Sequence, residues 1–317
     1  MLYPISVPIP NSAEDLCGYI NSYGEVAIPP SYLGCAHFFE GVAAVVDGEG
    51  RSGFIDRWGR VEIPFRFEGL SRFHNGICAI NGGYINHGGD WLIEPQFLVA
   101  SEFSEGLAFV SRDGENFGFI DLTGNFVIPP EFRPCRRFWE GLAAVCIDDR
   151  WGYIDTVGRL RIPAVFEGKR ATGFSNGMAG VQMDGRWGFI NREGIFVVKP
   201  EYEDARPFVE GRACVQQGGR WGLIDTDGRQ VVECRFDKLD RLDGGMAPAN
   251  TDGKAGFISP EGRWLIEPTF DRCFRFFGDL AIVRRGKTYS YIRRDGAVVW
   301  TSEVGALVQH PPAPFFV

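Results

Sequence analysis

The chain has 317 residues, of which 44% are hydrophobic and 23% charged, and its formal net charge is −8 with a pI near 5.2. An acidic protein lacks the basic footprint that phosphate binding needs, so we expect no nucleic-acid partner. No apolar run reaches the roughly 18 residues of a membrane helix, and the N-terminus lacks the regions of a signal peptide. We therefore expect no membrane partner and a cytoplasmic protein.

Two residue types stand out, because the sequence has 42 glycines and 27 phenylalanines. Many glycines without a Gly-X-Y period indicate tight turns, and aromatics suit half-buried strands, so we predict many short strands. Eight cysteines form no C-x-x-C pair and several stand in apolar runs, which favours buried free thiols. Four scattered histidines give no metal spacing, so we expect neither metal nor cofactor.

One short motif recurs nine times, and its clearest form is Arg150-Trp151-Gly152-Tyr153-Ile154-Asp155. The motif glycine returns every 30 to 36 residues, with Ser290 in the ninth place. A period of this length over the whole sequence indicates a repeat architecture. We therefore expect one domain, 1–317, with units at about 1–34, 35–70, 71–100, 101–134, 135–169, 170–204, 205–238, 239–273 and 274–302, and a C-terminal tail at 303–317. Its proline-broken end, 310–317, is either a frayed tail or an apolar strap that folds back on the array, and the two phenylalanines there favour the strap.

Each unit is predicted to form three antiparallel strands, which in the fifth unit cover 141–146, 150–155 and 160–163. Asp155 and Gly158 are spaced as in a type I turn closed by a left-handed glycine, so the recurring Asp is interpreted as a turn residue rather than a catalytic one. Proline follows the third strand in most units, which places that strand at a sheet edge. The connector to the next unit is left as a possible fourth strand.

The residue after the motif glycine is large in all nine copies, and the next residue is always Ile, as in Tyr153-Ile154. Successive strand residues face opposite sides, so a central strand that is apolar on both sides must be covered by neighbouring sheets. The first strand carries small side chains and the third strand and connector carry bulky ones, so each sheet is expected to be narrow at one edge and broad at the other, like a wedge. We favour an all-β open superhelical solenoid, with a closed β-propeller-like ring as the alternative, because nine units exceed the usual four to eight blades.

These residues resemble the bacterial WG-repeat (KWG-type) family, whose pattern combines Arg-Trp-Gly-Tyr-Ile-Asp, a Gly turn, Val-Ile-Pro-Pro and Phe-x-Glu-Gly. The best copies are Trp151-Gly152, Trp187-Gly188 and Trp221-Gly222, whereas Ser52-Gly53 and Ala255-Gly256 depart at the Trp. The resemblance implies an all-β repeat protein of bacteria and brings no catalytic residues.

The connectors vary more than the motif, and variable positions of a repeat array are where recognition is expected. Arginine recurs there and suits carboxylate or phosphate recognition. The alternative is that these arginines are solvated or pair with acids such as Glu140 and Glu210. The candidate partner-binding residues are Arg72, Arg133, Arg136, Arg137, Arg206, Arg241, Arg272 and Arg275.

We expect a non-catalytic, monomeric scaffold that binds another protein. One alternative is a carbohydrate-binding module that uses exposed aromatics such as Trp58, Trp139 or Trp300. A further alternative is an enzyme or small-ligand site in an axial channel of a closed ring. No nucleophile–base pair and no glycine-rich phosphate loop is evident, so we do not expect an enzyme.

Overall fold

The computed structural model describes residues 1–8 and 15–302, which form two compact units. Unit 1 contains 1–96 and 270–302, and unit 2 contains 97–269. The regular elements of the described residues are all β-strands, so no helix there is long and apolar enough to cross a membrane. The expected C-terminal tail at 303–317, with the strap at its end, lies outside the described residues.

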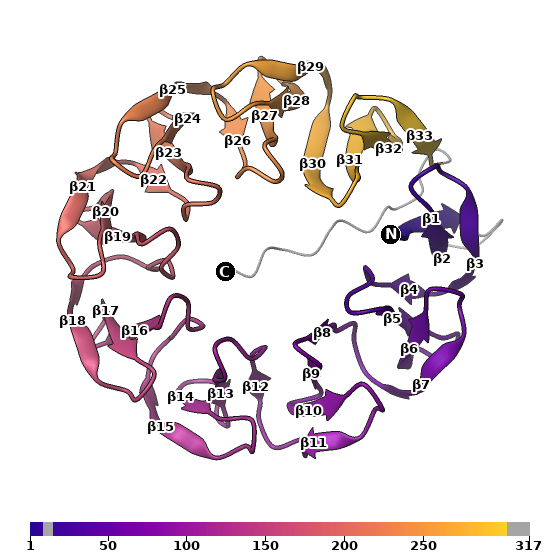
Figure 1. Cartoon of the computed structure of the whole chain (residues 1–317), viewed down its shortest axis with the longest axis horizontal. Helices are drawn as coiled ribbons and strands as arrows, with labels where there is room; N and C mark the ends of the chain where they lie inside the picture. Colours follow the sequence, from indigo (N-terminus) through magenta and orange to yellow (C-terminus); the bar gives the residue numbers. More distant parts are fainter. Residues whose placement is uncertain (9–14, 303–317) are drawn as a thin grey trace. The chain divides into compact units, whose positions relative to one another are not determined.

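Unit 1 holds four sheets, numbered in sequence order as sheets 1, 2, 3 and 9 (Figure 1). Sheet 1 consists of β1 (Tyr3–Pro8), β2 (Asp15–Ile20) and β3 (Val26–Tyr32), and sheet 2 of β4 (Gly34–Cys35), β5 (Val42–Val46), β6 (Ser52–Asp56) and β7 (Val61–Phe67). Sheet 3 consists of β8 (Phe73–His74), β9 (Ile77–Ile80), β10 (Gly83–Asn86) and β11 (Trp91–Ile93), and sheet 9 of β30 (Arg272–Phe277), β31 (Leu280–Arg285), β32 (Thr288–Arg293) and β33 (Val298–Thr301).

Unit 2 holds sheets 4 to 8. Sheet 4 consists of β12 (Val99–Ala100), β13 (Ala108–Ser111), β14 (Phe117–Ile120) and β15 (Phe126–Phe132), sheet 5 of β16 (Leu142–Ile147), β17 (Arg150–Asp155) and β18 (Leu160–Phe166), and sheet 6 of β19 (Ala179–Met183), β20 (Arg186–Ile190) and β21 (Phe196–Tyr202). Sheet 7 consists of β22 (Asp204–Ala205), β23 (Ala213–Gln217), β24 (Arg220–Ile224) and β25 (Gln230–Phe236), and sheet 8 of β26 (Lys238–Leu239), β27 (Ala247–Thr251), β28 (Lys254–Ile258) and β29 (Trp264–Phe270).

The connector forms a fourth strand in six sheets, so the expectation of three-stranded units is wrong for those six. In sheet 2, for example, Gly34 and Cys35 of β4 pair with Val46 and Val45. The connector runs along the first strand of its sheet. Pairing with that strand gives hydrogen-bond partners to backbone N–H and C=O groups that would otherwise be buried away from water without one. In sheets 5 and 6 it forms only single bridges. The proline-bearing third strand lies at a sheet edge, as predicted.

The two apolar faces of the motif strand pack against different neighbouring sheets, which confirms face-to-face stacking. In unit 2, Tyr153 of sheet 5 shares a core with Ile190 of sheet 6. Phe189 of sheet 6 in turn shares a core with Ile224 of sheet 7. All of these side chains are fully buried. The aromatic of one sheet and the Ile of the next therefore form the repeating core contact.

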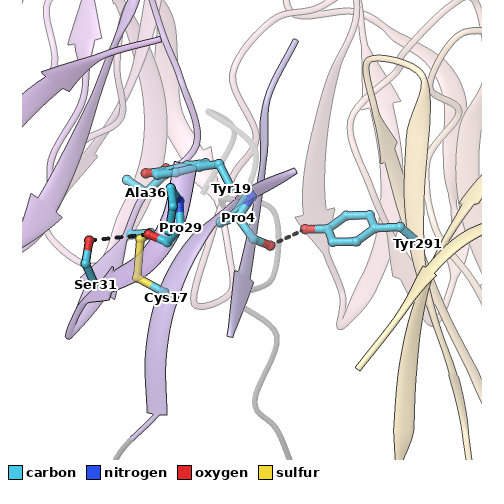
Figure 2. The surroundings of a disulfide bond; sticks show 8 residues. Pro4, Cys17, Tyr19, Pro29, Ser31, Ala36 and Tyr291 are labelled. Atoms are coloured by element: carbon cyan, nitrogen blue, oxygen red, sulfur yellow. Dashed lines mark hydrogen bonds between the residues drawn. A yellow bond between two sulfur atoms is a disulfide. The ribbon is translucent and has the colours of Figure 1, made fainter. Parts of the chain in front are cut away.

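The same contact joins sheet 9 to sheet 1 within unit 1, where Tyr291 packs in one core with Ile20. The Tyr291 hydroxyl donates a hydrogen bond of 2.7 Å to the Pro4 carbonyl (Figure 2). The centre of the Tyr291 ring lies 5.7 Å from that of the Tyr3 ring. An open superhelix leaves its first and last sheets without a shared face. The predicted open solenoid is therefore wrong, and the closed alternative, a β-propeller, is supported, because the two end faces cover each other.

The motif glycine lets another segment approach its backbone closely, and that segment is the third strand of its own sheet rather than the next sheet. A Cβ on Gly152 would lie 2.8 Å from the backbone of Ala164, in the third strand of the same sheet. The register between β17 and β18 shifts here, because Trp151 pairs with Phe166 whereas Tyr153 pairs with Ile162. Two extra residues of β18 thus form a bulge that folds over the glycine.

The turn role of the recurring Asp is confirmed. The Asp155 carboxylate accepts hydrogen bonds from the amides of Val157 at 3.1 Å and Arg159 at 2.9 Å. Gly158 closes the turn with a φ of 83°. The carboxylate is occupied by its own backbone, as expected of an Asx-type turn.

The expectation that the cysteines are all free is wrong for one pair, because Cys17 and Cys35 form a disulfide between sheets 1 and 2 (Figure 2). Cys17 stands where other units have the motif Trp, and Cys35 lies on the connector strand β4. Both side chains are buried. Sequence spacing does not show that sheet stacking brings these positions together. The other six cysteines are free, as predicted.

Candidate functional site

Some of the predicted arginines already have acidic partners inside unit 2. Arg137 forms a 2.7 Å ion pair with Glu102, and both side chains are largely buried, with 17% and 16% exposed. Arg206 forms a 2.8 Å ion pair with Asp240. The Asp240 carboxylate also accepts a hydrogen bond from the backbone amide of Arg241. These guanidinium groups link one repeat to the next.

Arginines also cover the motif tryptophans of unit 2. Arg206 lies 4.8 Å from the ring centre of Trp221, and Arg136 lies 5.7 Å from that of Trp151. Arg170, which the sequence analysis did not select, lies 4.6 Å from Trp187 and pairs with Asp204. A cation over an aromatic face is stabilising. Each unit with a motif Trp also has an Arg in its connector, and this recurrence in the sequence was a signal that the Arg packs on the Trp as part of the repeat structure.

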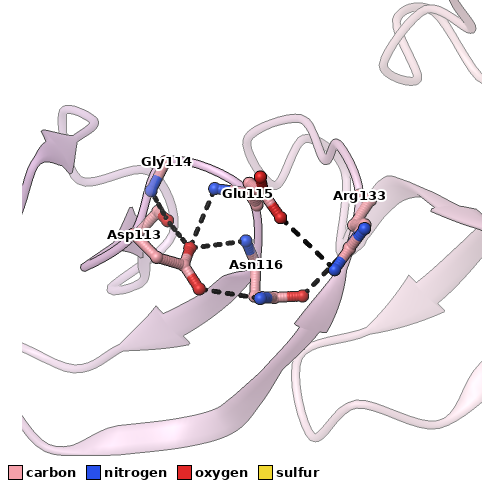
Figure 3. A network of polar contacts seen from close by, with 6 residues as sticks. Asp113, Gly114, Glu115, Asn116 and Arg133 are labelled. Atoms are coloured by element: carbon pink, nitrogen blue, oxygen red, sulfur yellow. Dashed lines mark hydrogen bonds and ion pairs between the residues drawn. The ribbon is translucent and has the colours of Figure 1, made fainter.

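Arg133 joins a polar network at an exposed hairpin (Figure 3). Its Nε donates to Asn116 at 3.1 Å, and its terminal nitrogen lies 3.5 Å from a Glu115 oxygen. The Asp113 carboxylate accepts the Asn116 and Glu115 amides, both at 2.8 Å. These hydrogen bonds, with Asn116 first, lower the pKa of Asp113 well below its usual range. The network orders the hairpin.

The candidates in unit 1 lie beside aromatic rings or are half-buried. Arg72 lies 5.0 Å from the ring centre of Phe39, and Arg272 lies 4.5 Å from that of Phe274. Arg275 is half-buried. The role of the eight candidate arginines in partner binding stays a prediction, and the structure shows that several of them also hold neighbouring repeats together.

A pocket of about 360 Å³ lies beside the Arg133 network, lined by Glu131, Arg133, Cys146, Ile147, Asp148 and Asp149. Burial raises the pKa of the Cys146 thiol, and the nearby Asp149 charge acts in the same direction. The thiol is therefore protonated at neutral pH, unlike the thiolate that nucleophilic catalysis needs. Within the described residues, no group of three or more His, Cys, Asp or Glu is placed to hold a metal ion.

Exposed apolar side chains gather on three consecutive sheets of unit 2. They come from the turn between the second and third strands and from the edge strand itself. Ile195 is 63% exposed and Val157 61%. The members, called here the apolar surface, are Leu122 and Val127 of sheet 4, Val157, Leu160 and Val165 of sheet 5, and Ile195 and Val197 of sheet 6.

The turn of each sheet lies on the edge strand of the preceding one, which makes these residues neighbours across sheets. A Cβ on Gly158 would lie 3.3 Å from Ile128, and one on Gly194 would lie 2.9 Å from Ile162. Exposed charges of both signs stand among the apolar side chains. The cations are Arg159, Arg161, Arg192 and Lys199, and the anions are Glu131, Glu193 and Glu201. The sequence held one signal for this surface. Two apolar residues stand next to each other on the edge strand, as Val197 and Val198 do, and because successive strand residues face opposite sides, one of the two must be exposed.

Among the tryptophans considered for carbohydrate stacking, Trp58 is 62% exposed, whereas Trp139 and Trp300 are half-buried. Arg57 lies 4.1 Å from the Trp58 ring centre and Arg60 lies 5.7 Å from it. Trp300 packs beside Tyr291, with ring centres 6.0 Å apart. These three residues do not form an array of exposed rings.

The repeats of this sequence match a known family. A model of the WG-containing repeat matches eight successive segments. The protein belongs to the WG-containing repeat family. The resemblance seen in the motif is thereby confirmed. The matched residues are 18–49, 53–81, 83–115, 117–151, 151–187, 187–221, 221–254 and 256–289.

Among solved structures, this WG-repeat protein is similar to one titled "Crystal structure of the eukaryotic initiation factor", with a TM-score of 0.66 and 11% identity over 98% of each chain. It is also similar to the computationally designed Ika8 protein, with a TM-score of 0.51 and 12% identity over 83% of this chain and 93% of that chain. At such identities the likeness shows the fold alone, and it supports a nine-bladed β-propeller. No curated protein matches this WG-repeat sequence.

Proposed function

We propose that this WG-repeat β-propeller is a scaffold that binds another protein through the apolar surface of sheets 4 to 6. One observation carries the proposal, namely that seven exposed aliphatic side chains lie on three consecutive sheets. Contiguous exposed apolar patches are characteristic of interaction sites, because their exposure is costly unless a partner covers them.

The charges around the apolar surface indicate the chemistry of the partner. Exposed cations and exposed anions alternate along it, as Arg192 and Glu193 do in one turn and Lys199 and Glu201 do on one strand. An apolar centre with a charged rim is the usual anatomy of an interface. The proposed partner therefore presents an apolar patch with a rim that carries charges of both signs.

The test uses the full-length protein with a photo-crosslinking residue in place of Val157, and a matched protein with the same residue in place of Val61 of sheet 2, which is also exposed. We expect a discrete protein to crosslink from position 157 and not from position 61. Equal crosslinking from both positions, or none from 157, would contradict the proposal.

The captured protein is then purified and its affinity measured by calorimetry. Ile195→Glu should weaken binding tenfold or more, about 1.4 kcal/mol, because it places a charge in the apolar contact. Val61→Glu serves as the control and should leave the affinity unchanged. Both sites are exposed, so neither variant should alter thermal stability much.

A further inference from the structure

Seven connector turns of the described residues share one backbone conformation, in which both central residues have positive φ, as Glu40 (51°) and Gly41 (89°) do. In the first of them, Phe39 and Val42 exchange backbone hydrogen bonds of 2.9 and 3.1 Å across the turn. This is the geometry of a type I′ turn. The central residues are 40–41, 75–76, 105–106, 140–141, 176–177, 210–211 and 244–245.

Two of these turns hold a carboxylate by both central amides. Glu40 accepts hydrogen bonds from the amides of Asn75 at 2.6 Å and Gly76 at 2.9 Å. Glu210 accepts them from Gly244 at 2.7 Å and Gly245 at 2.9 Å. In each case the two amides bind the two oxygens of one carboxylate, as anion-binding backbone concavities do.

Three further turns hold one oxygen by the glycine amide. Gly141 donates to Glu105 at 2.9 Å, and Gly177 donates to Glu140 at 3.0 Å. The amide of Gly211 donates to the side-chain oxygen of Asn176 at 3.2 Å. The glycine amide of a connector turn is thus an oxygen receptor that the protein itself fills five times, each time from the preceding turn.

The turns at Glu40–Gly41 and Glu105–Gly106 are open. Within residues 1–8 and 15–302, no acceptor reaches the amide of Gly41 or Gly106. Both glycines are exposed, and no atom lies within 4 Å of the place where a Cβ would stand. The turn's own Glu does not block the amide, because Gly141 binds Glu105 while Glu140 binds Gly177.

We propose that each of these two open turns, by itself, binds a carboxylate group of a partner peptide, in the way that the other turns bind the protein's own carboxylates. The source is either an acidic residue of that peptide or its C-terminal carboxylate, and backbone amide clusters capture both. Hydrogen bonds to a charged acceptor are the stronger kind, so a carboxylate is preferred to a neutral amide. The inference does not depend on the apolar surface, which lies on other strands.

The first experiment records amide NMR spectra of the full-length protein during titration with three small probes. N-acetylglutamate α-amide presents the carboxylate of an acidic residue, N-acetylglycine presents a C-terminal one, and N-acetylglutamine amide is the neutral control. We expect a saturable downfield shift at Gly41 and Gly106 with one or both acids, and none at Gly141, Gly177 or Gly245. An absent shift at both open turns, or an equal one with the neutral probe, overturns the proposal.

The second experiment opens a turn that is filled in the native protein. Glu210→Ala removes the carboxylate from Gly245, which should then become a third responding amide in the same titration. The control is Glu193→Ala, because Glu193 is exposed and contacts none of these amides. If Glu210→Ala fails to fold, Glu140→Ala frees Gly177 instead. A response at the newly opened turn without one at Gly41 and Gly106 overturns the proposal for the two native turns and leaves the proposed scaffold function untouched.

Discussion

The motif glycine and the motif Ile carry out different tasks although they lie on the same face of their strand. Gly152 admits the bulge of its own edge strand, whereas Ile154 fills the contact with the preceding sheet. A Cβ on Gly152 would lie 2.8 Å from the Ala164 backbone, and Ile154 is 1% exposed. Substitutions at these two positions should therefore be among the most damaging in the protein.

Ile154→Asp should lower the free energy of unfolding by about 4 kcal/mol, because it buries a carboxylate without a partner between two sheets. Ile154 is 1% exposed, and Ile195, which is 63% exposed, provides the matched control. Urea unfolding of both variants checks this expectation. Similar stability of Ile154→Asp and Ile195→Asp would contradict the stacking of the sheets.

Gly152→Ala should cost about 2 kcal/mol, since its Cβ would lie 2.8 Å from backbone atoms that cannot move cheaply. Gly48→Ala is the control, because nothing lies within 4 Å of the added methyl group there. Thermal unfolding should show a lower midpoint for the first variant and an unchanged one for the second. An unchanged midpoint for Gly152→Ala would argue against the bulge.

Glu40 should make stability depend on pH. Burial acts to raise its pKa, but hydrogen bonds from the Gly76 amide, His87 and the Asn75 amide together lower it. A lowered pKa stabilises the fold above the ordinary Glu value, and that stabilisation is lost as the pH falls through the lowered value. The stability difference between the native protein and Glu40→Gln should thus be present at pH 7 and vanish in acid. Denaturation midpoints at pH 7 and pH 3 measure it, and a difference that grows in acid would contradict the assignment.

At the scale of elements, the connector is the part that the sequence described least well. It supplies a fourth strand to six sheets, a positive-φ turn at seven places, and the covalent link between sheets 1 and 2. Short strands of two residues, such as β4 and β22, lack a period that a sequence can show.

The disulfide should stabilise this region measurably. Cys17 and Cys35 are 18 residues apart, and closing a loop of that size stabilises a fold by about 3 kcal/mol. Reduction should therefore lower the melting temperature of the native protein. The double variant Cys17→Ala/Cys35→Ala should melt at a low temperature with or without reductant. Equal sensitivity to reductant in both proteins would show that another cysteine pair is responsible.

At the scale of the whole molecule, the contact between sheet 9 and sheet 1 decides the fold class. Tyr291 and Ile20 form across the two ends of the array the same contact that Tyr153 and Ile190 form within it. Because sheets 9 and 1 cover each other in unit 1, the two ends of the array leave no apolar end face that needs a cap.

Deleting residues 170–203, which hold sheet 6, should lower stability throughout the molecule. A closed array that loses one sheet must either leave a gap between apolar faces or strain the remaining contacts. We expect the deletion variant to melt well below the native protein in differential scanning calorimetry. A native-like melting temperature would mean that the neighbouring sheets simply stack again, as they would in an open array.

The sequence by itself determined the repeat, the turn role of Asp155, the edge position of the proline-bearing strand and the two buried faces of the motif strand. These features depend on local turn chemistry and on the two-residue period of a strand, which single residues report directly. Only the tertiary structure decided closure, the Cys17–Cys35 pair, the neighbour of Gly152 and the exposure of Val157 and Ile195. Whether the array closes depends on the rotation angle between successive sheets added up over all of them, and no single residue of the sequence determines that total angle.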